Sequence, residues 1–235
     1  WWFDLVSRGW FDYDGFWVKN KELMRFMERY STVKSAGTPE VCFILDEKAM
    51  SIAGDAQTIG MELLTYSGGT LYRSGCRFGM YLIEDLLDRK IDDAILYVMV
   101  NPWRLLDEAV EKLTPVLHRQ GKTTLWMVGN GMTSEKNMER LTGMSIKPVL
   151  TPDEYVPRFR RSDDSVIGGG SGKEREVRLN PVYCVQETSD IKVLGRYVGG
   201  NADRQPGFTE YEKDGWKSIF FGGAEIPEQL LEYAV

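Results

Sequence analysis

Residues 41–47 read Val-Cys-Phe-Ile-Leu-Asp-Glu, a continuous apolar run that ends in two acidic residues. A strand buried on both faces of a parallel sheet has this pattern, because neither face carries alternating polar side chains. Helical patterns and further short apolar runs then alternate along the chain, at residues 57–74, 78–83, 94–100, 106–119, 123–128 and 134–141. This alternation predicts an α/β fold with an open, doubly wound parallel sheet.

The two ends of the chain differ from this central pattern. Residues 1–36 join an aromatic, strand-like run to a helix that Asn20 is expected to cap, and Gly37 ends that helix. After Gly143 the runs become short, β-rich and separated by turns, with strands expected at 182–186, 191–198 and 216–221 and a final helix at 227–233. We therefore expect a first part over residues 1–37 and an α/β domain over 38–235 whose β-rich part starts at about residue 145.

Composition limits the classes of function. The chain has 235 residues, 43% of them hydrophobic, with a net charge of −6 and a pI near 5.1. An acidic chain without a basic stripe argues against a nucleic-acid partner. No apolar run approaches the roughly 20 residues that span a bilayer, so we expect a soluble protein without a membrane partner, either cytoplasmic or exported. The chain begins with Trp1 and shows no signal-peptide pattern, which favours a fragment of a larger protein.

Motifs for phosphate, metal or cofactor binding are incomplete. The glycine-rich stretch 168–173 lacks the first glycine of a phosphate-binding loop, and Glu174 follows Lys173 where Ser or Thr is needed. The three cysteines, Cys42, Cys76 and Cys184, lack metal-ligand spacing and predict neither a zinc site nor a disulfide framework. We expect no metal and no cofactor.

A catalytic nucleophile is also missing. The turn at 128–132, after the predicted strand 123–128, stands where class I glutamine amidotransferases carry a nucleophilic cysteine, but it contains no Cys, Ser or Thr at its centre. The only histidine, His118, falls in the last turn of a helix, where it is expected to interact with the helix C-terminus. Acidic residues are numerous enough that a pair for glycoside hydrolysis stays open, although Asp85 has the position of a helix cap.

The first seventeen residues concentrate aromatic and acidic side chains. Trp2 and Trp10 lie close in sequence to Asp4. Aromatic faces stack on the C–H surfaces of sugars while carboxylates hold their hydroxyl groups, so this mixture suits a carbohydrate site. Hydrophobic packing between domains is the alternative interpretation. We predict substrate contacts by Trp2, Asp4 and Trp10.

An ordered series of segments then resembles one enzyme family. Trp1-Trp2-Phe3-Asp4 with residues 9–12 looks like the last barrel strand and loop of β-galactosidase-like glycoside hydrolases related to family 42. Their trimerisation domain, which has an amidotransferase-like fold, is similar to the segments that follow in the same order: 40–47, 73–75, 81–87, 97–102, 107–108, 121–126, 194–197 and 226–231.

This resemblance implies that residues 1–37 are the last strand and helix of a (β/α)8 barrel and that 38–235 form a flavodoxin-like domain. In the family that domain assembles a trimer and helps to close the active site, while the catalytic glutamates lie on earlier barrel strands. No catalytic residue is therefore expected in this chain, which should be inactive alone, with a homo-oligomer and a carbohydrate substrate as partners. The alternative is a non-catalytic carbohydrate-binding or interaction module on the same fold.

Overall fold

The computed structural model describes residues 13–32, 38–53, 59–91, 93–151, 155–168 and 178–234. The chain divides into two compact units, Trp1–Gly37 and Thr38–Val235. In the first unit, the described structure is the helix α1 (Asp14–Tyr30) and the residues next to it. The second unit contains the sheet.

Helix α1 begins six residues before Asn20, so the predicted cap at Asn20 is wrong. Asp14 lies in the first turn and Arg29 in the last, where each charge offsets the helix dipole, and Lys19 pairs with Glu22 at 2.8 Å. These charges support a helix through Asn20, whose side chain is therefore not needed as a cap. None of the helix residues is buried in the described structure.

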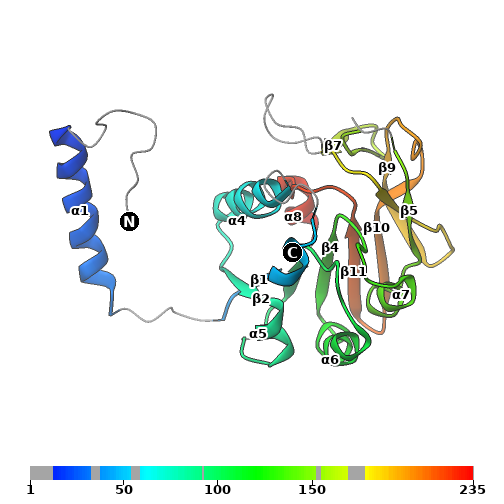
Figure 1. The fold of residues 1–235 in the computed structure, drawn as a ribbon, viewed down its shortest axis with the longest axis horizontal. Coiled ribbons are helices and arrows are strands. Elements are labelled where there is room, and N and C mark those ends of the chain that lie inside the picture. The colour runs from blue at the N-terminus through cyan, green and yellow to red at the C-terminus, as the bar shows by residue number, and fades with distance from the viewer. Residues whose placement is uncertain are drawn as a thin grey trace. The chain divides into compact units, whose positions relative to one another are not determined.

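Within its described residues, the second unit is built on a nine-stranded mixed sheet in the order β2-β1-β3-β4-β11-β10-β9-β6-β7. Figure 1 shows this sheet with helices around it. Neighbouring strands from β2 to β11 run parallel, and those from β11 to β7 run antiparallel. The strands are β1 (Val41–Leu45), β2 (Phe78–Leu82), β3 (Leu96–Met99), β4 (Thr123–Met127), β6 (Arg158–Arg161), β7 (Val166–Gly168), β9 (Ile191–Tyr197), β10 (Pro206–Lys213) and β11 (Trp216–Phe221). A separate two-stranded sheet pairs β5 (Ile146–Val149) with β8 (Val182–Val185).

Helices cover both faces of the sheet, as predicted. Side chains alternate along β1: Val41 and Phe43 belong to one buried cluster, and Cys42 and Ile44 belong to the other. The helices of the first face are the π-helical turn η1 (Met61–Tyr66), α4 (Ser67–Ser74) and α8 (Glu228–Ala234), and those of the second are α5 (Ile83–Leu87), α6 (Asp107–Leu117) and α7 (Glu135–Thr142). The parallel core with an antiparallel extension confirms the predicted fold class.

The predicted strands β1 to β4 and the predicted helices α6 and α7 are confirmed within a residue or two, and η1 and α4 lie inside the helical stretch predicted at 57–74. The short helices α2 (Glu47–Met50) and α5 were not predicted. The prediction missed β5, β6, β7 and β10 in the antiparallel part. Strand β6 shows why, because only Phe159 is buried among its arginines and pairing with β9 holds the strand in place. Helix α8 begins directly after Pro227, at Glu228, in agreement with the predicted final helix.

Candidate functional site

The aromatic site residues predicted from the sequence, Trp2, Asp4 and Trp10, lie outside the described residues. Their contact with a carbohydrate stays a prediction. The glycine-rich stretch 169–173 also lies outside, so the structure leaves that motif as the sequence has it.

The described residues form a second candidate site where β1 and β3 end. The Asp46 backbone N–H donates to Oδ1 of Asn101 at 2.8 Å, and Nδ2 of Asn101 donates to the Asp46 carbonyl oxygen at 2.7 Å. From β1 the chain proceeds to β2 on one side, whereas from β3 it proceeds to β4 on the other. In open α/β sheets, ligands bind at the carboxyl ends of the strands where the order reverses in this way.

The side chain of Asp46 is buried, with only 5% of the residue exposed. Its Oδ1 accepts the Ala49 backbone N–H at 3.1 Å and so caps the short helix α2 (Glu47–Met50). Burial raises the pKa of Asp46, and the nearby negative charge of Glu84 adds to that rise, although the bond from Ala49 opposes it. Asp46 is thus the N-cap residue of α2.

A pocket of about 370 Å³ opens beside Asp46, between α5 and the start of α6. Nζ of Lys48 lies 2.7 Å from Oε1 of Glu84, and this hydrogen bond is the main reason why the pKa of Glu84 is lowered. The other oxygen of that carboxylate, Oε2, is buried and has no hydrogen-bond partner among the described residues. The exposed side chain of Arg104 also lines the pocket, and the structure assigns it no ion pair within the described parts of the chain.

The turn after β4 has the shape of a nucleophile turn without its chemistry. Val128 adopts φ 66°, a left-handed conformation that is strained for a β-branched residue, and the Gly129 N–H donates to the Met127 carbonyl at 2.8 Å. Val128 is buried, the Tyr183 ring packs on Gly129, and the backbone at Gly131 lies against Trp103. A buried valine supplies no nucleophile, in line with the sequence interpretation.

His118 makes structural contacts. It follows the last residue of α6, its Nε2 lies 2.8 Å from the Leu141 carbonyl oxygen, and its ring stacks on Trp216 with centroids 3.7 Å apart. Since a carbonyl only accepts, Nε2 carries the proton. Burial lowers the pKa of His118, although the bond to Leu141 opposes that shift. His118 therefore connects α6 to α7 and β11. The prediction had instead placed its interaction at the C-terminus of its own helix.

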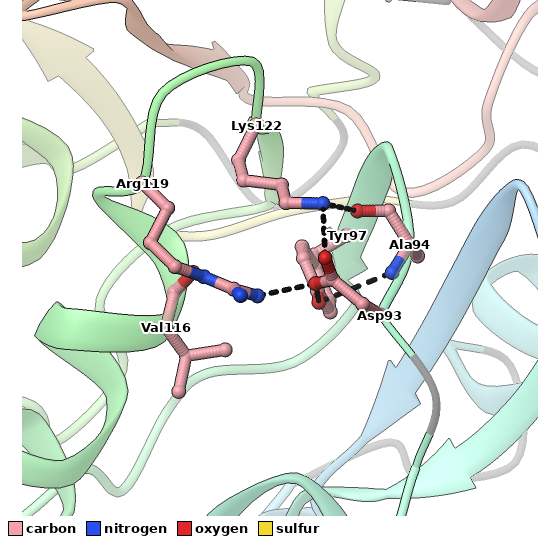
Figure 2. A network of polar contacts seen from close by, with 6 residues as sticks. All are labelled: Asp93, Ala94, Tyr97, Val116, Arg119 and Lys122. Atoms are coloured by element: carbon pink, nitrogen blue, oxygen red, sulfur yellow. Dashed lines mark hydrogen bonds and ion pairs between the residues drawn. The ribbon is translucent and has the colours of Figure 1, made fainter.

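Figure 2 shows a polar network at the opposite, amino-terminal ends of β3 and β4. The Asp93 carboxylate accepts hydrogen bonds from Arg119, from Nζ of Lys122 at 2.7 Å and from the Tyr97 hydroxyl at 3.0 Å. Burial would raise the pKa of Asp93, but the bonds from Lys122 and Tyr97 outweigh it and lower the pKa. Every polar group drawn has a partner within the protein, so this network joins elements rather than offering a binding site.

The described residues contain neither a candidate metal site nor a candidate membrane-spanning helix. None of their His, Cys, Asp and Glu side chains form a group of three or more placed to hold a metal ion. No helix within the described ranges is both long and apolar enough to cross a membrane.

Comparisons with known proteins identify the fold. A catalytic mutant of a family 42 β-galactosidase from G. stearothermophilus matches 98% of this chain and 34% of its own, at 12% identity and a TM-score of 0.63. A β-galactosidase from the Antarctic haloarchaeon Halorubrum lacusprofundi matches 88% of this chain and 31% of its own, at 13% identity and a TM-score of 0.62. This chain has the fold of a part of the family 42 β-galactosidases.

A similar fold is found in an enzyme that acts on a different sugar. An exo-β-1,4-mannosidase from Opitutaceae bacterium strain TAV5 matches 83% of this chain and 33% of its own, at 11% identity and a TM-score of 0.54. The chain thus spans about a third of the length of the solved structures that it matches. No protein-family model matches the sequence, and no curated protein is significantly similar to it.

Proposed function

We propose that this chain is the part of a β-galactosidase-like glycoside hydrolase that assembles the enzyme and helps to close its active site, without performing the chemistry. The observation that carries this proposal is the structural match, which extends over most of this chain but only about a third of each enzyme. The turn at Val128 and the ring of His118 supply no catalytic pair in the described structure, which is consistent with a catalytic centre elsewhere.

Residues 1–37 are, in this proposal, the last strand and helix of the catalytic barrel. Helix α1 supports it, because Trp17, Met24, Phe26 and Met27 are each at least half exposed in the described structure. Such an apolar surface on a helix needs a partner to leave water. The rest of a barrel would provide one, and Trp2, Asp4 and Trp10 would then contact the substrate at the end of the last barrel strand.

The first test is to read the coding sequence upstream of the Trp1 codon and to assay the pure chain with aryl galactosides. We expect the reading frame to continue through about seven strand–helix units, and we expect no turnover by the chain alone. Robust turnover would sink the proposal, as would a start codon directly before Trp1. Sedimentation velocity of the longer protein with and without residues 38–235 then tests assembly, with a smaller mass expected after the deletion.

A non-catalytic carbohydrate-binding module is the second candidate, favoured by the aromatic residues near the start of the sequence. Calorimetry separates the two proposals. Micromolar galactoside binding by this chain, abolished in both Trp2→Ala and Trp10→Ala, would favour the module. The fold itself does not select the sugar, because both galactosidases and a mannosidase share it.

A further inference from the structure

The pocket at the carboxyl ends of β1 and β3 has the position and the polar groups of a ligand site. Its volume of about 370 Å³ is that of a small-molecule pocket. It lies where the strand order reverses, and the cross-strand bonds between Asp46 and Asn101 fix that edge.

The charges around the pocket balance. Three carboxylates and three cations line it: Asp46, Glu84, Glu108, Lys48, Arg104 and Lys112. A ring of mixed charge without excess of either sign disfavours a phosphate or another ligand of high net charge. Two ion pairs, Lys48–Glu84 at 2.7 Å and Lys112–Glu108 at 2.9 Å, use four of these groups.

The groups that remain are complementary to hydroxyl groups. The Glu84 side chain is 40% exposed, but its Oε2 is closed to water and has no hydrogen-bond partner among the described residues. Buried acceptors normally have a partner, and a ligand hydroxyl would provide one once the carboxylate turns toward the pocket. Arg104 offers guanidinium donors, and Asp46 offers a carboxylate whose Oδ1 accepts the backbone N–H of Ala49. A hydroxyl group both donates and accepts, so neighbouring hydroxyls satisfy a carboxylate and a guanidinium together.

The remaining wall is aliphatic, with Leu87 and Leu106 among its residues, and Leu106 is 67% exposed. Such side chains suit the C–H face of a sugar ring. No aromatic side chain of the described structure lines this pocket, so binding lacks a stacking platform and should be weak.

We propose that this pocket binds a small, neutral, polyhydroxylated ligand, a mono- or disaccharide. The choice of a sugar rests on the proposed function, whereas the pocket and its unpartnered acceptor do not. Hydroxyl groups of the ligand donate to Glu84 and Asp46 and accept from Arg104.

The test is a titration of the full chain with D-galactose, followed by ¹H–¹⁵N NMR. We expect saturable shifts of the amides near Asp46, Glu84 and Arg104. Arg104→Gln removes an exposed side chain, so the fold is retained, and we expect a dissociation constant raised about tenfold or more, the cost of a charge-assisted hydrogen bond. Arg140→Gln, which removes an exposed arginine from α7, is the matched control and should bind as the wild type does.

Several results overturn the inference. The first is the absence of saturable shifts at the pocket, and the second is an equal loss of affinity for D-galactose in both arginine variants. The third is the same set of shifts with glycine in place of galactose, which would indicate a site for zwitterions. Glu84→Gln gives a second check, and unchanged affinity in that variant would also count against the site. None of these outcomes depends on hydrolysis or assembly, so failure here leaves the proposed function standing, and turnover of aryl galactosides sinks the proposed function alone.

Discussion

The parallel and antiparallel parts of the sheet each contain a carboxylate that contacts two cations and a tyrosine, in two environments. In the parallel part, Asp93 contacts Arg119, Lys122 and Tyr97 just before β3. Its side chain is 49% exposed. In that position the carboxylate keeps much of its hydration, so its ion pairs add little to the free energy of unfolding.

In the antiparallel part, the corresponding carboxylate is Glu210, which lies inside strand β10. Its Oε2 accepts from the Tyr233 hydroxyl at 2.7 Å, and Lys192 and Lys217 each lie 3.3 Å from the carboxylate. The Glu210 side chain is only 8% exposed. Similar ion pairs and hydrogen bonds therefore contribute differently to the free energy of unfolding according to their burial. The Glu210 carboxylate has lost the hydration that the Asp93 carboxylate keeps.

The largest effect is expected for Glu210→Ala. Loss of the carboxylate removes the acceptor of the Tyr233 hydroxyl and of Lys217, although Lys192 keeps its bond to the Tyr233 oxygen. This loosens α8, so we expect a loss of roughly 2–3 kcal/mol in the free energy of unfolding. Urea denaturation followed by circular dichroism measures it. Glu212→Ala, at an exposed position of the same strand, is the control and should stay within about 0.5 kcal/mol. Equal effects of the two variants would show that burial of Glu210 is unimportant.

The pH dependence sharpens the same comparison. Burial opposes ionisation of Glu210, but Tyr233 and the two lysines outweigh it, so the folded pKa lies below the ordinary 4.5. A lowered pKa contributes stability above the unfolded value, and this stability is lost as the pH falls through the folded value. The stability difference between wild type and Glu210→Gln should therefore be constant from pH 7 to about 5 and shrink below about pH 4.5. A difference that grows in acid would contradict this sign.

A smaller effect is expected for Asp93→Asn. Because Asp93 and Arg119 are about half exposed, their interaction is screened by water and the loss should be about 1 kcal/mol or less. Added salt should reduce the difference further. Denaturation at low and high ionic strength tests both points, and a loss as large as that for Glu210→Ala would remove the distinction between the two clusters.

The two parts also differ in how far the sequence predicts them. Residues 41–45 are all apolar, and residues 123–127 end in the apolar run Leu125-Trp126-Met127, so the local sequence indicates burial on both faces and predicts these strands. Strand β10 starts with Pro206-Gly207 and contains Glu210, whose charge argues against burial until Lys192, Lys217 and Tyr233 are brought to it from three other elements. Such strands depend on partners distant in sequence.

The residues of the candidate site can likewise be predicted only where the local sequence identifies them. Asp46 could be predicted as an acid at a strand end, because the apolar run stops there. Glu84 and Arg104 could not be assigned to the same pocket, since β2, β3 and their connections separate them from Asp46 in sequence. The sequence offers no local signal for the partnerless Oε2 of Glu84, which arises from packing alone.

The smallest net change is expected at the strained turn of the parallel part. Val128→Gly loses roughly 2 kcal/mol of buried side chain and some backbone entropy, but it removes strain of about 1–3 kcal/mol at φ 66°. We therefore expect a net loss below about 1 kcal/mol. The matched control is Val98→Gly in β3, which is fully buried in an ordinary extended strand and should lose about 3 kcal/mol. If both variants lose the same stability, Val128 is not strained, and the turn then resembles a nucleophile turn in its path but not in its energy.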